Sequence, residues 1–194
     1  MTVDPTQPAL TNPAALSQAC FRALMDAMAL PGRLHAVGVG LSPPAPLHPA
    51  TAAVLMTLVD GETPLWLDPS AWAARDWLAA RCGAAFAASP AGCSFALALS
   101  LPDLATLPAG GGETPEASAT LILQVGALGS GVRLRLMGPG MQEPAVLAVD
   151  GLTEDFVAHW AINRALYPRG VDLVLCAGTM LAALPRSVTV EAAH

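Results

Sequence analysis

Five charged side chains are the candidates for ligand contact, catalysis or subunit contact in this sequence. Three are carboxylates at the predicted beginning or end of an element, and two are arginines: Asp60, Glu116, Asp172, Arg135 and Arg186. A carboxylate at such a position can act as a general acid or base, although it more often caps an element or forms a turn. Asp150 has a similar position, and the same two interpretations apply to it.

The two arginines suggest anion binding, ion pairing or subunit contact. Arg186 stands between Pro185 and Ser187, at the junction of two predicted strands. Its planar guanidinium could hold a phosphate or carboxylate, pair with an internal aspartate or dock a partner subunit. Arg135 shares one face of a predicted strand with Arg133, where exposed arginines are routine and interface arginines act as anchors. The sequence leaves these alternatives open.

Several kinds of site are excluded by residue type. The chain has no lysine, since all nine of its basic residues are arginine. A P-loop needs a lysine to reach the nucleotide phosphates, and pyridoxal phosphate needs one for its Schiff base. No Gly-x-Ser-x-Gly elbow is present, and the cysteines and histidines are scattered without metal-ligand spacing. The glycines at 126, 129 and 131 lie between two predicted strands, so no helix N-terminus follows them to hold a phosphate.

Composition indicates an acidic domain that is poor in charge. Of 194 residues, 54% are hydrophobic and 12% are charged, with a net charge of −6. This charge balance argues against nucleic-acid binding, and the low charged fraction suggests surface covered by partners. The uncharged stretches are broken by proline and glycine, so no membrane span is expected. The N-terminus lacks a signal peptide's basic and apolar regions, which favours a cytoplasmic protein.

The predicted helices follow from apolar periodicity and from breakers. Asn12-Pro13 predicts a helix start and Pro31-Gly32 a sharp stop. The apolar stripe of this first helix comprises Leu16, Cys20, Leu24, Ala27 and Met28, widened by Phe21. Further helices are expected at residues 50–59, 71–81 and 153–166.

The predicted strands alternate with these helices. They are expected at residues 34–39, 63–67, 95–99, 120–125, 132–137, 171–176, 180–184 and 188–191. Strands 120–125 and 132–137 are predicted to form a hairpin around the glycine-rich turn, and residues 42–49 and 100–118 to be a connector and a long loop. Mixed strands and helices predict a layered α/β domain with a mixed sheet over residues 13–194, after a loosely ordered segment 1–12.

Four stretches, in order, resemble the PhnH family of the bacterial carbon–phosphorus lyase system. They are residues 21–28 (FRALMDAM) with Pro31-Gly32, 55–67 (LMTLVDGETPLWL), 115–125 (PEASATLILQV) and 168–175 (PRGVDLVL) leading to Leu184-Pro185-Arg186. Leu134-Arg135-Leu136-x-Gly138-x-Gly140 adds a fifth match, and residues 69–114 match weakly. The resemblance covers roughly residues 16–191.

The resemblance implies a subunit of a larger machine. Family members act with PhnG, PhnI and PhnL to transfer the ribose 5-triphosphate of ATP to an alkylphosphonate, with release of adenine. They are homodimers alone and join a core complex with PhnG, PhnI and PhnJ. The implied fold is a three-layer α/β/α arrangement similar to the large domain of pyridoxal-phosphate transferases, without that cofactor.

The nucleosidase step is assigned to PhnI, so no catalytic residue, cofactor or metal carries over. Whether this chain has activity of its own stays open. A stand-alone phosphonate- or nucleotide-binding module using Arg135 and Arg186 is the alternative.

Overall fold

A six-stranded mixed sheet forms the centre of the protein. The computed structural model describes residues 13–193, so the segment 1–12 that was expected to be loosely ordered lies outside the described residues. The strands are β1 (His35–Ala36), β2 (Leu65–Leu67), β3 (Phe95–Ala98), β4 (Thr120–Gln124), β7 (Asp172–Ala177) and β8 (Met180–Leu184). Their order is β1-β8-β7-β4-β3-β2. Strands β2, β3, β4 and β7 are parallel, and β8 runs antiparallel to both of its neighbours.

One face of this sheet is covered by helices. They are α1 (Pro13–Ala29), α2 (Pro49–Leu58), the 3-10 helix η1 (Pro69–Ala74) and α3 (Arg75–Cys82). Because successive strand residues point to opposite faces, Leu97, Ile122 and Val174 pack among these helices, while their neighbours in sequence point the other way. Burial on both faces explains the nearly continuous apolar sequences of β3, β4 and β7.

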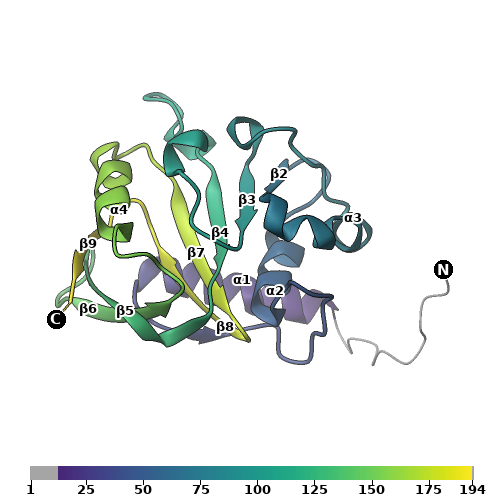
Figure 1. Cartoon of the computed structure of the whole chain (residues 1–194), viewed down its shortest axis with the longest axis horizontal. Coiled ribbons are helices and arrows are strands. Elements are labelled where there is room, and N and C mark those ends of the chain that lie inside the picture. The colour runs from purple at the N-terminus through teal and green to yellow at the C-terminus, as the bar shows by residue number, and fades with distance from the viewer. Residues whose placement is uncertain (1–12, 194) are drawn as a thin grey trace.

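A second, three-stranded antiparallel sheet and one helix cover the opposite face (Figure 1). This sheet has the order β6-β5-β9, with β5 at Ala127–Met137, β6 at Ala145–Asp150 and β9 at Thr189–Ala192. Beside it lies α4 (Phe156–Ala165), whose Phe156 and Trp160 are fully buried and stack with ring centroids 6.1 Å apart. Trp160 Nε1 also donates a hydrogen bond to the carbonyl of Val188 at 2.8 Å, which ties α4 to the segment before β9.

The predicted hairpin of residues 120–125 and 132–137 is wrong. β4 pairs with β3 and β7 in the large sheet, whereas β5 pairs with β6 and β9 in the small one. The glycines do not form its turn: Gly129 and Gly131 lie within β5 at φ of 98° and 91°, where the pairing with β6 is interrupted between Leu128 and Val132. Strand β6, which the sequence analysis did not predict, takes the place beside β5.

Other elements agree with the prediction or differ from it at their ends. The helices expected at 13–30, 50–59 and 153–166 are confirmed as α1, α2 and α4. The strand expected at 34–39 shrinks to β1, and the helix expected at 71–81 is divided between η1 and α3. The long loop contains two 3-10 turns, η3 (Leu104–Thr106) and η4 (Pro115–Ala117), and η2 (Pro90–Gly92) precedes β3.

The fold class is therefore mixed α/β with a mixed sheet, as predicted. The third layer differs from helices alone, because α4 shares it with the small sheet. None of the helices within residues 13–193 is long and apolar enough to cross a membrane. The similarity to the large domain of pyridoxal-phosphate transferases stays a prediction.

Candidate functional site

Asp172 and Arg186 meet at the end of the large sheet where β4 and β7 begin. Asp172 is the first residue of β7 and lies opposite Thr120, the first residue of β4. Arg186 follows the end of β8 by two residues. Because β7 and β8 are antiparallel and Leu173 faces Leu184, the start of one strand and the end of the other lie side by side. The sheet topology thus brings together two residues that are 14 positions apart.

The two side chains form a bidentate ion pair. Arg186 Nε lies 3.1 Å and 3.2 Å from the two carboxylate oxygens of Asp172, and Arg186 Nη2 donates to Oδ2 at 2.5 Å. The backbone N–H of Arg186 also donates to Asp172 Oδ1, at 2.7 Å. Arg186 Nη1 donates to the carbonyl of Pro115 at 2.8 Å. Only 17% of the Arg186 side chain and 19% of the Asp172 side chain are exposed, so the pair is largely desolvated.

The chain before Asp172 is fixed by its own contacts. Asn163 of α4 is buried, and its amide donates to the carbonyl of Val171 and accepts from the N–H of Val171 at 2.9 Å and 2.8 Å. Gly170 has φ of 118°, and a Cβ there would lie 3.0 Å from the carbonyl oxygen of Asn163. Only glycine fits this turn without strain. The aspartate is therefore held in place by α4 as well as by β7.

A shallow depression of about 350 Å³ opens beside the ion pair. Its lining includes Asp172, Arg186, the exposed Glu116 of η4 and the half-exposed Tyr167. The guanidinium charge is compensated by Asp172, and Glu116 adds a further negative charge. Arg186 therefore offers no uncompensated positive charge to a phosphate in the depression. The contacts of Arg186 with Asp172 and Pro115 connect the chain after β8 to β7 and to the long loop.

The other two candidates lie elsewhere and make local contacts. Asp60 closes a turn, since its Oδ1 accepts from the N–H groups of Glu62 and Thr63 and from the Thr63 hydroxyl at 2.9–3.0 Å. The hydrogen bond from the Glu62 N–H, followed by that from the Thr63 hydroxyl, lowers the pKa of Asp60. Arg135 of β5 pairs across the small sheet with Glu191 of β9 at 2.9 Å, with both side chains about half exposed. Both contacts are typical of turns and surface ion pairs.

Other arginines also have partners within the chain. The guanidinium of Arg75 lies over the rings of Trp72 and Phe86, at 5.4 Å and 4.7 Å from their centroids. Arg164 Nε donates to the carbonyl of Ser187 at 2.9 Å, and its guanidinium lies over the Tyr167 ring. Within residues 13–193, no three His, Cys, Asp or Glu side chains gather in a way that could hold a metal ion.

A buried polar network that was not expected from the sequence lies at the opposite end of the strands, where β4 ends. Gln124, the last residue of β4, is 8% exposed. Its Oε1 accepts from the N–H of His48 at 2.7 Å and from the Thr51 hydroxyl at 2.8 Å, and its Nε2 donates to the carbonyl of Pro46 at 2.8 Å. The sequence signal for this network is a single glutamine at the end of an apolar strand.

The network places the proline-rich connector across the carboxyl ends of β4 and β7. His48 Nδ1 accepts from the N–H of Gly178 in the β7–β8 turn, and the N–H of Ala50 donates to the carbonyl of Gly178 at 2.8 Å. In open α/β sheets, ligands usually bind at this edge, where the order of the parallel strands reverses. Here β2, β3, β4 and β7 follow one another in chain order, so they have no such reversal. The connector covers the ends of β4 and β7.

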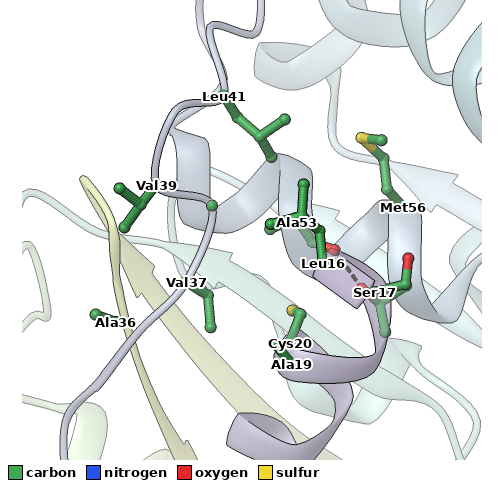
Figure 2. Close-up of a pocket in the computed structure, with 12 residues that line it drawn as sticks. Leu16, Ser17, Ala19, Cys20, Ala36, Val37, Val39, Leu41, Ala53 and Met56 are labelled. Atoms are coloured by element: carbon green, nitrogen blue, oxygen red, sulfur yellow. Dashed lines mark hydrogen bonds between the residues drawn. The ribbon is translucent and has the colours of Figure 1, made fainter. Parts of the chain in front are cut away.

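An apolar pocket of about 180 Å³ lies between α1, α2 and residues 36–41 (Figure 2). Leu16 and Cys20 line it from α1, and Ala53 and Met56 from α2. Burial raises the pKa of the Cys20 thiol, although a hydrogen bond with Thr57 acts in the opposite direction. Few polar atoms face this space, so it suits an apolar group better than a phosphonate or a nucleotide.

We expect none of the four cysteines to react as an activated nucleophile. Burial raises the pKa of Cys82 and Cys93 to about 11 and raises that of the fully buried Cys176. At pH 8, a thiol with pKa near 11 is thiolate in about one molecule in a thousand, and only the thiolate reacts. Labelling with a coloured disulfide reagent should be slow in the folded protein and reach four thiols in urea. Rapid reaction of one thiol that is lost in Cys20→Ser would contradict this expectation and indicate a reactive pocket.

These features define a mixed α/β protein in which four of the five candidate charged groups, all except Glu116, contact other groups of the same chain. The comparisons then give the family. The sequence pattern of the family described as bacterial phosphonate metabolism protein (PhnH) matches residues 8–191. The chain belongs to this family.

Two relatives match along nearly their whole length. The chain is 38% identical over 188 residues to the alpha-D-ribose 1-methylphosphonate 5-triphosphate synthase subunit PhnH of Rhizobium meliloti (strain 1021), covering 94% of each chain. It is 36% identical over 180 residues to the putative C-P lyase subunit protein HtxG of Stutzerimonas stutzeri, covering 91% of this chain and 88% of that one.

Proposed function

We propose that this chain is an accessory subunit of the phosphonate carbon–phosphorus lyase core complex. In this proposal it acts with PhnG, PhnI and PhnL to transfer the ribose 5-triphosphate of ATP to an alkylphosphonate, with release of adenine. The observation that carries the proposal is the 94% mutual coverage with a relative named as a subunit of the alpha-D-ribose 1-methylphosphonate 5-triphosphate synthase. A match over that length makes a shared role in the assembly the simplest inference.

The geometry supports an accessory role rather than a complete active site. Arg186 is engaged by Asp172 and Pro115, and the connector lies over the carboxyl ends of β4 and β7. The arginine that lines the depression beside η4 is therefore already engaged, whereas a triphosphate would need several free cationic donors. We propose that the reacting groups belong to another subunit and that this chain contributes surface and stability.

The alternative, a stand-alone module that binds phosphonate or nucleotide through Arg135 and Arg186, has less support. The side chains of both arginines already contact carboxylates of the same chain, Glu191 and Asp172. Binding an anion would require breaking those pairs. Titration calorimetry of the isolated protein with ATP and with methylphosphonate tests this alternative, which tight binding would support.

Co-expression tests the main proposal. We expect the tagged chain to co-purify with PhnG, PhnI and PhnJ when all four are produced together, and the isolated chain to release no adenine from ATP. A tagged chain that purifies alone in the presence of the other subunits would contradict the proposal. An isolated chain that releases adenine would contradict the accessory role while leaving the pathway intact.

The remaining expectations belong to the same proposal. They are a homodimer when the chain is alone, a cytoplasmic location, and a fold similar to the large domain of pyridoxal-phosphate transferases without their cofactor. The absence of lysine from the whole sequence supports the last point, because no residue can form the Schiff base.

A further inference from the structure

The apolar pocket between α1, α2 and residues 36–41 has walls that are fixed by contacts outside it. The N–H of Val37 donates to the carbonyl of Thr179 at 2.8 Å, which holds the wall formed by residues 36–41. Gly38 has φ of 68°, and a Cβ there would lie 2.2 Å from the carbonyl oxygen of Pro49. Only glycine therefore allows this wall to lie so close to the start of α2. The pocket is preformed, as small-molecule sites usually are.

The lining of the pocket is apolar and uncharged. None of the twelve described residues that line it carries an ionised side chain. Burial raises the pKa of the Cys20 thiol, so this side chain is also neutral at pH 7. The hydroxyl of Thr57 donates to the carbonyl of Ala53 in its own helix at 2.7 Å. A charged or strongly polar ligand would therefore lose its hydration here with little compensation.

The pocket opens to solvent past apolar side chains. Leu16 of α1 and Val39 line it and are 41% and 66% exposed (Figure 2). Leu16 and Phe21 were both expected to lie in the buried stripe of α1, yet Phe21 is 49% exposed as well. A ligand in the pocket would remove the apolar surface of Leu16 and Val39 from water, which favours binding.

Sulfur and size together indicate an aromatic ligand. Cys20 and Met56 line the pocket from α1 and α2 (Figure 2). Sulfur is polarizable, and a methionine sulfur gains from contact with the edge of an aromatic ring at about 5 Å. The three rotatable bonds of Met56 allow its sulfur to adapt to such a ring. The volume of about 180 Å³ exceeds that of an engineered apolar cavity of about 150 Å³ that binds benzene.

We propose that this pocket is a binding site for a small neutral aromatic molecule of one or two fused rings. The ring lies between α1 and α2 with its edge toward the sulfur atoms of Cys20 and Met56, and Leu16 and Val39 cover its outer side. The site is independent of the proposed function, because all of its lining residues belong to this chain and none of them contacts the Asp172–Arg186 pair.

Two probes of similar shape and opposite polarity test the chemical class. Titration calorimetry of the full chain should show that indole binds at least about tenfold more tightly than adenine. Both are fused two-ring molecules, but adenine would bury ring nitrogens and an amino group that find few partners in the pocket. An absence of indole binding, as when another segment or subunit already fills the pocket, would overturn the proposal. Adenine binding as tight as that of indole would also overturn it.

The location is tested by filling the pocket. Ala53→Leu adds three carbon atoms from α2 and should weaken indole binding about tenfold or more. Ala161→Leu adds the same atoms on the exposed side of α4 and should leave binding unchanged. Amide chemical shifts of the wild-type chain give the location even if Ala53→Leu folds poorly. Indole should shift the signals of residues 16–20, 36–41 and 53–57, and shifts confined to other segments would overturn the proposal.

The preference for an aromatic ring is tested by removing one sulfur. Met56→Leu keeps an apolar side chain of similar size and should weaken indole binding about two- to tenfold, the usual worth of a sulfur–aromatic contact. Binding of cyclohexane, which has no aromatic ring, should stay the same in this variant. Chemical-shift titrations measure both ligands on both proteins. Equal changes for indole and cyclohexane would show that the pocket does not select an aromatic ring and would overturn that part of the proposal.

Discussion

Replacing Arg186 with alanine should lower the free energy of unfolding by about 3–5 kcal/mol, the usual cost of breaking a buried ion pair by removing one partner. The substitution leaves the carboxylate of Asp172, which is 19% exposed, with only the backbone N–H of Arg186 from its present partners. It also removes the donor to the carbonyl of Pro115 and so frees the long loop from the end of β8. Urea denaturation followed by circular dichroism measures the effect.

Arg135→Ala is the matched control for this experiment. It also removes an arginine from an ion pair with a carboxylate of the same chain, but the Arg135 and Glu191 side chains are 48% and 59% exposed. Water screens such a pair, so the expected loss is about 0–1 kcal/mol. If Arg186→Ala instead unfolds like the wild type while the assembled complex loses activity, the structural interpretation is wrong and Arg186 has a role in a site.

Replacing Gln124 with leucine should cost about 3 kcal/mol, although the two side chains are similar in size. The amide satisfies the N–H of His48, the hydroxyl of Thr51 and the carbonyl of Pro46, all next to the end of β4. Leucine would leave these groups without their partner, and each unsatisfied buried group costs about 1–3 kcal/mol.

The control is Gln142→Leu, because Gln142 is exposed in the loop before β6 and has no comparable network among the described residues. The free energy of unfolding of Gln142→Leu should lie within about 0.5 kcal/mol of that of the wild type. Amide hydrogen exchange should also show faster exchange at the N–H of His48 in Gln124→Leu, because this bond holds the connector. Unchanged stability together with unchanged exchange would show that the connector is held by its other contacts.

The sequence determined the local elements well where their signals are local. Proline and glycine at 31 and 32 mark the end of α1, and proline at the first helical position marks its start. Apolar runs likewise located β3, β4 and β7 to within a residue or two. The residue types alone also excluded a Schiff base, since the chain has no lysine. These conclusions need only nearest-neighbour stereochemistry and chemical identity.

Strand partnership was decided by tertiary structure. Gly126 to Gly131 are compatible with a hairpin turn, but β4 pairs with two strands that are distant in sequence and β5 joins a separate sheet. The apolar sequence of β4 indicates that both of its faces are buried, but it does not identify the strands that lie beside it. Pairing β4 with β3 and β7 buries it, whereas the half-exposed β5 suits a sheet with one face toward water.

The candidate site shows the same division. The sequence singled out Asp172 and Arg186 and left pairing, anion binding and docking open for the arginine. Only the antiparallel meeting of β7 and β8 places the carboxylate within 2.5–3.2 Å of the guanidinium, and desolvation then favours the pair over a free cation. Gln124 and the exposed Phe21 depended on tertiary structure too, because burial is set by what packs against a side chain. Residue types fixed which chemistry is possible, and the packing of distant segments decided which groups remain free to perform it.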